Sequence, residues 1–208
     1  MLCGEKMHIK SETLEGWMKF IRFHPDKAER YMDCFWGSQL SSKRNLLGVL
    51  EGEDFPGTTY IFGGWYGILA QLIDDDPNII SRDIYSIDND PDCEWVINDV
   101  IKRDNIMPIT ADMATFEYEA PPNTVINCIT EHVTQQQYDM WWENIPTGTF
   151  YILQGNNFWE ADDHIRCSKN MDDFQHINNC CNSMLGFATW DCKGPIDYFE
   201  RYMVWGIK

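Results

Sequence analysis

Apolar residues in the first quarter of the chain recur at the spacing of helix faces. From residue 11 to residue 50 they return every three or four positions, as on the buried side of an amphipathic helix. The hydroxyl of Ser11 is expected to cap the first helix. A second helix is predicted after the turn at Pro25, and a third from about Ser41. The segment therefore predicts three successive helices.

Beyond residue 57, short apolar runs alternate with helical patterns. The runs predict strands at residues 59–62, 84–88, 107–109, 124–129 and 149–154. Helices are predicted at residues 68–73, 93–101 and 136–142. The final runs, residues 184–191 and 198–205, flank Gly194 and Pro195 and predict an antiparallel hairpin. Elements that alternate in this way are typical of an α/β protein with a parallel sheet covered on both faces.

The first predicted strand ends in glycines, and the second ends in an acid. Gly63, Gly64 and Gly67 interrupt the first apolar run, and Asp88 lies 21 residues after Gly67. Glycines let the backbone approach a ligand closely, and an acid at a strand end can accept hydrogen bonds from ribose hydroxyls. This order predicts a nucleotide-type cofactor site at the first turn of a βαβ unit. An ordinary α/β core with the same runs is the alternative.

Length and composition favour one packed domain. The 208 residues are 44% hydrophobic and 14% aromatic, which suffices for one well-buried core. We expect residues 1–54 to form a helical cap on an α/β core of residues 55–208. No apolar run approaches 18 residues, and the start lacks the pattern of a secretion signal, so a cytoplasmic location is expected.

The charge balance narrows the range of partners. A net charge of −17 arises from 16 basic and 33 acidic residues. Such a field repels phosphate backbones, whose neutralisation supplies most nonspecific affinity for nucleic acids. Duplex nucleic acid is therefore disfavoured, and a small molecule or a protein is the expected substrate. No membrane partner is expected. Nothing in the pattern indicates the oligomeric state.

The eight cysteines do not form a recognised framework. They contain no C-x-x-C pair, and reduced thiols are expected in a cytoplasm. His164, Cys167, His176, Cys180 and Cys181 have the ligand types of a zinc site but not a recognised spacing. No metal is predicted on this basis, and scattered buried or surface side chains are the expected arrangement.

Four short segments together carry a resemblance to a known family. They are residues 62–67, 87–90, 110–113 and 125–128. In this order they resemble the class I S-adenosylmethionine-dependent methyltransferases. A narrower resemblance, to small methyltransferase-like proteins of phages and some bacteria, is carried by residues 63–67, 127–132, 153–158 and 201–206. The resemblance implies a Rossmann-like, seven-stranded and mostly parallel sheet with a C-terminal antiparallel β-hairpin and helices on both faces. For a phage protein, the expected location would be the host cytoplasm.

The same resemblance implies S-adenosyl-L-methionine as the cofactor and assigns its contacts. The glycine turn would lie under the methionine and ribose parts, Asp88 would hold the ribose hydroxyls, and Asp112 with Met113 would contact adenine. Trp65 lies at the same edge and could stack on adenine or on the sulfonium. The full set of expected cofactor-binding residues is Gly63, Gly64, Trp65, Tyr66, Gly67, Asp88, Asn89, Asp90, Asp112, Met113 and Asn127.

The chain departs from the family pattern at three points. The family's acid before the glycine turn is absent, since Ile61 stands at about its place. Another residue would therefore have to contact the amino group of the cofactor. The middle glycine is replaced by Trp65 or Tyr66. No Asn-Pro-Pro-Tyr or Asp-Pro-Pro-Tyr tetrapeptide follows the fourth predicted strand, which argues against base or amide nitrogen methylation of that style.

Candidate catalytic residues follow the fourth predicted strand. His132 can accept a proton near neutral pH, and Glu131 could orient it or bind a cationic substrate. A histidine that merely caps the next helix is the alternative. His164 is a second candidate base. Three carboxamides after the fifth strand could orient a substrate, although asparagine is also common in turns: Gln154, Asn156 and Asn157.

The expected activity is methyl transfer from S-adenosylmethionine to a small molecule or a protein side chain. Transfer of the aminocarboxypropyl group of the same cofactor is the nearest enzymatic alternative. A non-catalytic binding or regulatory protein with this fold is the alternative from another class. A nicotinamide dehydrogenase is disfavoured because a strict G-x-G-x-x-G motif is missing. The triple acid at residues 74–76 is expected to be a solvated loop.

Overall fold

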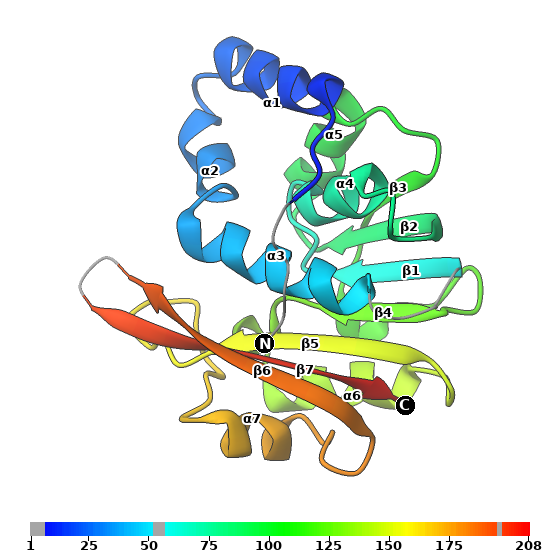
Figure 1. Ribbon diagram of the computed structural model, residues 1–208, viewed down its shortest axis with the longest axis vertical. Coiled ribbons are helices and arrows are strands. Elements are labelled where there is room, and N and C mark those ends of the chain that lie inside the picture. The colour runs from blue at the N-terminus through cyan, green and yellow to red at the C-terminus, as the bar shows by residue number, and fades with distance from the viewer. Residues whose placement is uncertain (1–6, 52–56, 195–196) are drawn as a thin grey trace.

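The computed structural model describes residues 7–51, 57–194 and 197–208. A single seven-stranded sheet of order β3-β2-β1-β4-β5-β7-β6 crosses the molecule (Figure 1). Its strands are β1 (Gly57–Phe62), β2 (Ser81–Asp88), β3 (Ile106–Thr110), β4 (Thr124–Asn127), β5 (Phe150–Asn156), β6 (Met184–Lys193) and β7 (Tyr198–Ile207). The first five strands are mutually parallel, and β7 runs antiparallel to both β5 and β6. The expected fold class is therefore confirmed.

Helices cover both faces of this sheet. They are α1 (Ser11–Phe23), α2 (Ala28–Asp33), α3 (Gly37–Leu50), α4 (Ile68–Asp75), α5 (Pro91–Val100), α6 (Gln135–Asn144) and α7 (Met171–Ile177), with the 3-10 turns η1 (Met113–Thr115) and η2 (Thr130–His132). In the described part of the chain, no helix is both long and apolar enough to cross a membrane.

The two faces have separate hydrophobic cores. On one face, Trp17 and Leu46 of the N-terminal helices pack with Ile126 of β4 and with α4 and α5. On the other face, Trp141 of α6 packs with Phe62 of β1 and with α7. The central strands β4 and β5 are buried on both sides, as expected for the middle of a parallel sheet. Because β1 to β5 are parallel, their carboxyl ends all lie on the same side of the molecule, at one end of the strands.

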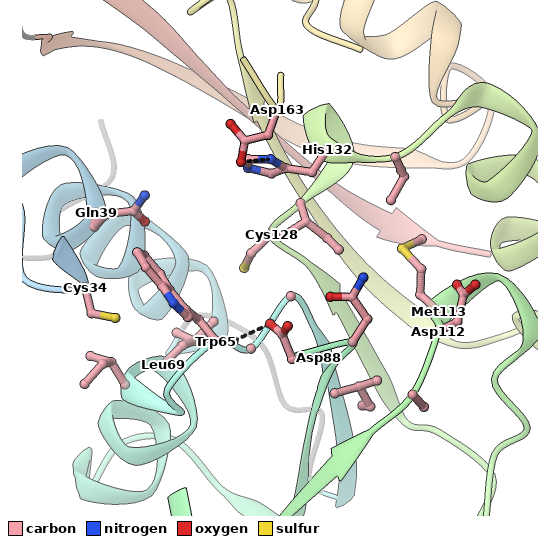
Figure 2. A pocket seen from close by; sticks show the side chains of 18 of the residues that line it. Cys34, Gln39, Trp65, Leu69, Asp88, Asp112, Met113, Cys128, His132 and Asp163 are labelled. Carbon is pink, nitrogen blue, oxygen red and sulfur yellow. Dashed lines mark hydrogen bonds and ion pairs between the residues drawn. The ribbon is translucent and has the colours of Figure 1, made fainter. Parts of the chain in front are cut away.

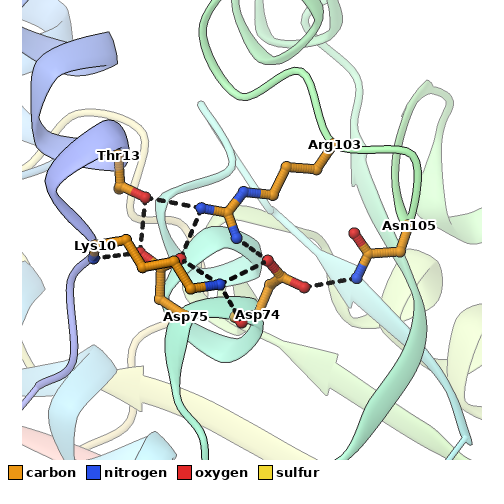
Figure 3. A network of polar contacts seen from close by, with 6 residues as sticks. All are labelled: Lys10, Thr13, Asp74, Asp75, Arg103 and Asn105. Carbon is orange, nitrogen blue, oxygen red and sulfur yellow. Dashed lines mark hydrogen bonds and ion pairs between the residues drawn. The ribbon is translucent and has the colours of Figure 1, made fainter.

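A buried ion-pair network joins α1 to α4, and it corrects the expectation of a solvated acidic loop (Figure 3). The side chain of Asp75 is fully buried and lies 2.7 Å from Nη2 of Arg103. The same carboxylate accepts hydrogen bonds from the Thr13 hydroxyl at 2.7 Å and from the backbone N–H of Lys10 at 3.0 Å. Arg103 also pairs with Asp74. Asp74 and Asp75 lie at the end of α4. Because Thr13 of α1 and Arg103 both contact Asp75, the pair of acids fixes α1 against α4.

Two local predictions are wrong, and one helix was missed. Ser11 does not cap α1, because the helix already begins there and the preceding Lys10 stands at the N-cap without a side-chain cap. The N–H of Lys10 donates to Asp75, so a tertiary contact replaces the local cap. The third helix begins at Gly37, ahead of the predicted start near Ser41. Helix α7 was not predicted, although Asn170 caps it by accepting from the N–H of Asp173.

Candidate functional site

A cavity of about 720 Å³ opens at the carboxyl ends of β1, β2 and β4. Figure 2 shows Asp112 and Met113 at one side of it, Cys34 and Gln39 at the opposite side, and His132 with Asp163 above Asp88. Cavities of this size suit a cofactor-sized ligand. The lining residues are Arg30, Cys34, Gln39, Lys43, Gly63, Gly64, Trp65, Ile68, Leu69, Ile87, Asp88, Asn89, Ala111, Asp112, Met113, Cys128, Ile129, His132, Val133, Gln137, Asp163 and His164.

The glycine turn after β1 is packed tightly beneath the cavity. Gly63 has a φ of 67°, and a Cβ atom there would lie 2.1 Å from the side chain of Ile129. Trp65 takes a φ of 47°, which is uncommon for a residue with a side chain, and lines the cavity. Gly67 and Tyr66 face away from the lining: Gly67 packs on α5, and Tyr66 on Tyr31.

Asp88 closes the end of β2 and organises the turn. Its Oδ2 accepts a hydrogen bond from the N–H of Trp65 at 3.0 Å, and its Oδ1 accepts from the N–H of Asp90 at 3.1 Å. Burial raises the pKa of Asp88, although these two donors oppose the shift. An ionised carboxylate has further lone pairs for a ligand's hydroxyl groups. Asn89 lines the cavity beside it.

Asp90 does not line the cavity, and its side chain instead makes structural contacts. Its side chain accepts from the N–H of Asp92 at 2.9 Å and caps α5. It also pairs with Nη2 of Arg30 at 2.5 Å, and the Arg30 guanidinium lies 5.5 Å from the ring centre of Tyr66. The acid therefore ties α2 to the start of α5 at the mouth of the cavity.

Asp112 and Met113 form the side of the cavity next to β3. Asp112 is exposed, and its Oδ1 accepts from the N–H of Ala114 at 2.9 Å. Met113 is buried and has Asn127 beneath it, with Nδ2 of Asn127 4.0 Å from the methionine sulfur. Asn127 is fully buried, and its Oδ1 accepts from the N–H of Ile129, so it supports the lining from below.

His132 and His164 meet at the β4 end of the cavity. Their ring centres are 4.6 Å apart and the rings are nearly perpendicular. The carboxylate nearest to His132 is Asp163, with Oδ2 3.2 Å from Nδ1. The prediction that Glu131 orients His132 is therefore replaced by a contact with Asp163. Glu131 is buried, and one of its oxygens accepts from Nδ2 of Asn156.

The carboxamides predicted to orient a substrate are engaged within the protein and do not line the cavity. Gln154 receives a hydrogen bond from the hydroxyl of Ser42 at 2.7 Å and donates to its carbonyl at 3.0 Å. Asn157 accepts from the N–H of Glu200 at 2.7 Å. Gln154 and Asn156 belong to β5 itself, and because strand residues alternate in direction, a place near the end of this strand does not by itself direct a side chain into the cavity.

The N-terminal helices supply lining residues that the sequence analysis missed. Gln39 and Lys43 lie four positions apart on α3, and the Lys43 amine is 3.4 Å from Oε1 of Gln39. Burial lowers the pKa of Lys43. Burial also raises the pKa of the Cys34 thiol to about 12 and that of Cys128 to about 11. A polar pair at this spacing on an amphipathic helix is a weak signal, because such pairs usually face solvent.

Comparison with known proteins bears on the fold. No protein-family model matches the sequence, and no curated protein matches it. Solved structures do match: YcgJ from Bacillus subtilis has a TM-score of 0.65 and 9% identity over 81% of this chain and 98% of its own. The N-methyltransferase NodS from Bradyrhizobium japonicum has a TM-score of 0.60 and 10% identity over 82% and 97%. The chain has the class I methyltransferase fold.

A third solved structure covers a larger share of this chain. The DhpI–SAH complex matches with a TM-score of 0.59 and 12% identity over 94% of this chain and 98% of its own. At such low identity, the likeness concerns the fold alone. The site itself has to be argued from the residues of this chain.

Proposed function

We propose that this protein transfers a methyl group from S-adenosylmethionine to a small molecule or a protein side chain. The observation that supports this most strongly is the place of Asp88. The acid ends β2, borders a cavity of about 720 Å³ and is flanked by the glycine turn. In an open α/β sheet, ligands bind at the carboxyl ends of the strands, and an acid at this end suits ribose hydroxyls.

The residues present match the chemistry of each part of the cofactor. Asp88 and Asn89 would accept from the ribose hydroxyls, and Asp112 would accept from the adenine amine. Met113, with its soft thioether, would pack on the purine ring. Trp65 lies between these groups and α3, where its ring can stack on a sulfonium.

Lys43 and Gln39 would hold the methionine end of the cofactor. The Lys43 amine can pair with the carboxylate, and the side-chain oxygen of Gln39 can accept from the amino group in place of the missing family acid. Both groups lie on α3, and Figure 2 shows Gln39 on the opposite side of Trp65 from Asp112. The N-terminal helices are therefore part of the proposed binding site.

The transfer itself requires an oriented acceptor and a place for one proton. A lone pair of the acceptor attacks the methyl carbon, the C–S bond breaks and the sulfur leaves as a neutral thioether. We assign proton acceptance to His132, which lines the cavity and has Asp163 at its Nδ1. Orientation and exclusion of water supply much of the rate in such a reaction.

Calorimetric titration with S-adenosylhomocysteine tests the cofactor assignment. Wild-type protein should bind one equivalent, and Asp88→Ala should weaken binding about 100-fold, as lost charged hydrogen bonds predict. The matched control is Asp99→Ala, an exposed acid on α5, which should bind as the wild type does. Absence of binding by the wild type would contradict the proposal. Binding without transfer to any acceptor would instead support a regulatory protein with this fold.

A further inference from the structure

We propose that Glu131, His132 and His164 bind one divalent zinc-type ion at the acceptor end of the cavity. Each residue offers one ligand atom, and these atoms lie within 4.8 Å of one another. Nitrogen from two histidines and oxygen from one carboxylate form a set that binds catalytic zinc and leaves a position open. His132 and His164 line the cavity, so that open position faces the proposed acceptor.

The carboxylate of Glu131 is buried with one oxygen lacking a partner. Asn156 donates to Oε1, whereas no group in the described residues donates to Oε2. Glu131 is only 3% exposed. An unpaired carboxylate oxygen away from water is costly, because nothing replaces its lost hydration. A cation bound next to both histidines would satisfy this oxygen.

The partners of the two histidines fix which ring nitrogen remains available. Nδ1 of His164 lies 2.6 Å from the carbonyl oxygen of Phe158. A carbonyl only accepts, so Nδ1 carries the hydrogen and Nε2 keeps its lone pair. Nδ1 of His132 faces the carboxylate of Asp163 in the same way. Metal-binding histidines are usually oriented by such a carbonyl or carboxylate behind the ring.

The geometry requires a small closure for metal binding. Tetrahedral zinc with bonds of about 2.1 Å separates its ligand atoms by about 3.4 Å. The ligand atoms lie at most 4.8 Å apart, so metal binding requires them to approach by up to about 1.4 Å, which is within reach of side-chain rotation. His132 and His164 are half-buried and can rotate toward the fixed Glu131. The cluster shares only His164 with the set considered from sequence; His176, Cys180 and Cys181 do not join it in the described structure.

A metal here would specify an acceptor with a hydroxyl group, an inference that rests on the proposed function. A bound divalent ion lowers the pKa of a coordinated hydroxyl, so its proton passes to a water molecule. The resulting oxygen attacks the methyl carbon, the C–S bond breaks and a thioether leaves. His132 then acts on the acceptor through the metal, as a ligand in place of a free base.

Titration of metal-stripped full-length protein with Co²⁺ tests this site. We expect one equivalent with the visible absorption of a low-symmetry site, displaced by Zn²⁺. Glu131→Gln and His164→Gln should each weaken binding at least 100-fold, more than is typical for loss of an outer-shell partner. His176→Gln, an exposed histidine on α7, is the matched control and should bind as the wild type does.

Two results would overturn the metal site. One is absence of stoichiometric Co²⁺ binding, and the other is binding that persists unchanged in both ligand variants, which would indicate surface carboxylates. The same variants are titrated with S-adenosylhomocysteine, both to show that they are folded and to separate the two proposals. Wild-type protein that binds Co²⁺ but not S-adenosylhomocysteine would contradict methyl transfer alone.

Discussion

The two ends of the cavity are built from different kinds of segment. The cofactor end uses Asp88 and Asp112, which end or closely follow parallel strands. A second set combines Lys43 from α3, at the methionine end of the cofactor, with His132 from η2 and His164 from the long segment between β5 and α7, at the acceptor end. Local chain geometry therefore places the first set, whereas tertiary packing of distant segments places the second. The comparison shows which part of a site a sequence can reveal.

The largest expected effect concerns the packing that holds α1, the first of the N-terminal helices, against α4. Asp75→Ala should lower the free energy of unfolding by about 3–5 kcal/mol, because it removes a fully buried carboxylate that pairs with Arg103 and accepts from Thr13 and from the N–H of Lys10. Urea unfolding measures this change. Asp99→Ala, on the exposed side of α5, should stay within about 0.5 kcal/mol of the wild type. A loss below 1 kcal/mol for Asp75→Ala would show that the network does not hold α1.

The difference between the two ends explains what the sequence could predict. The glycine turn and Asp88 were recognisable because a strand, a turn and a strand end occur within one short stretch. The positions of Asp163 and Lys43 were not, since they depend on how a long loop and α3 pack against the sheet. Asp75 was misread for the same reason: its partners Thr13 and Arg103 are distant in the chain.

The next effect tests the local geometry of the cofactor end. Gly63→Ala should destabilise the fold by about 1–3 kcal/mol, because its φ is 67° and the new Cβ would clash with Ile129. Thermal unfolding and S-adenosylhomocysteine titration follow the change. Gly148→Ala is the control, since its φ is also positive but nothing lies within 4 Å of the new atom. Equal losses in both variants would mean that backbone strain alone matters at Gly63.

A smaller effect distinguishes the methionine end of the cofactor site from its adenine end. Lys43→Met should weaken S-adenosylhomocysteine binding about tenfold, the value of one charged hydrogen bond. It should leave binding of adenosine unchanged, because adenosine lacks the methionine carboxylate. Asp112→Ala should instead weaken both ligands, since both carry adenine. Competition calorimetry measures the affinity of each of the two variants for each of the two ligands. Equal loss of adenosine binding in Lys43→Met would remove the lysine from the methionine end.

The smallest effect is a pH dependence that arises from Lys43. Burial lowers the pKa of this amine, so it loses its proton at a lower pH than a solvated lysine does. The affinity for S-adenosylhomocysteine should therefore decline as the pH rises through the lowered pKa, because only the charged amine pairs with the carboxylate. The difference in binding free energy between the wild type and Lys43→Met, measured at each pH, isolates the contribution of Lys43 from titration of the ligand. A constant difference across the alkaline range would contradict the assignment.

The most direct test of the cofactor site is a crystal structure of the protein with S-adenosylhomocysteine. The account predicts adenine between Asp112 and Met113, the ribose hydroxyls on Asp88 and the methionine carboxylate near Lys43. The sulfur should then face the side of the cavity that holds His132. Density for the ligand outside this cavity, or in it with the ribose away from Asp88, would contradict the account.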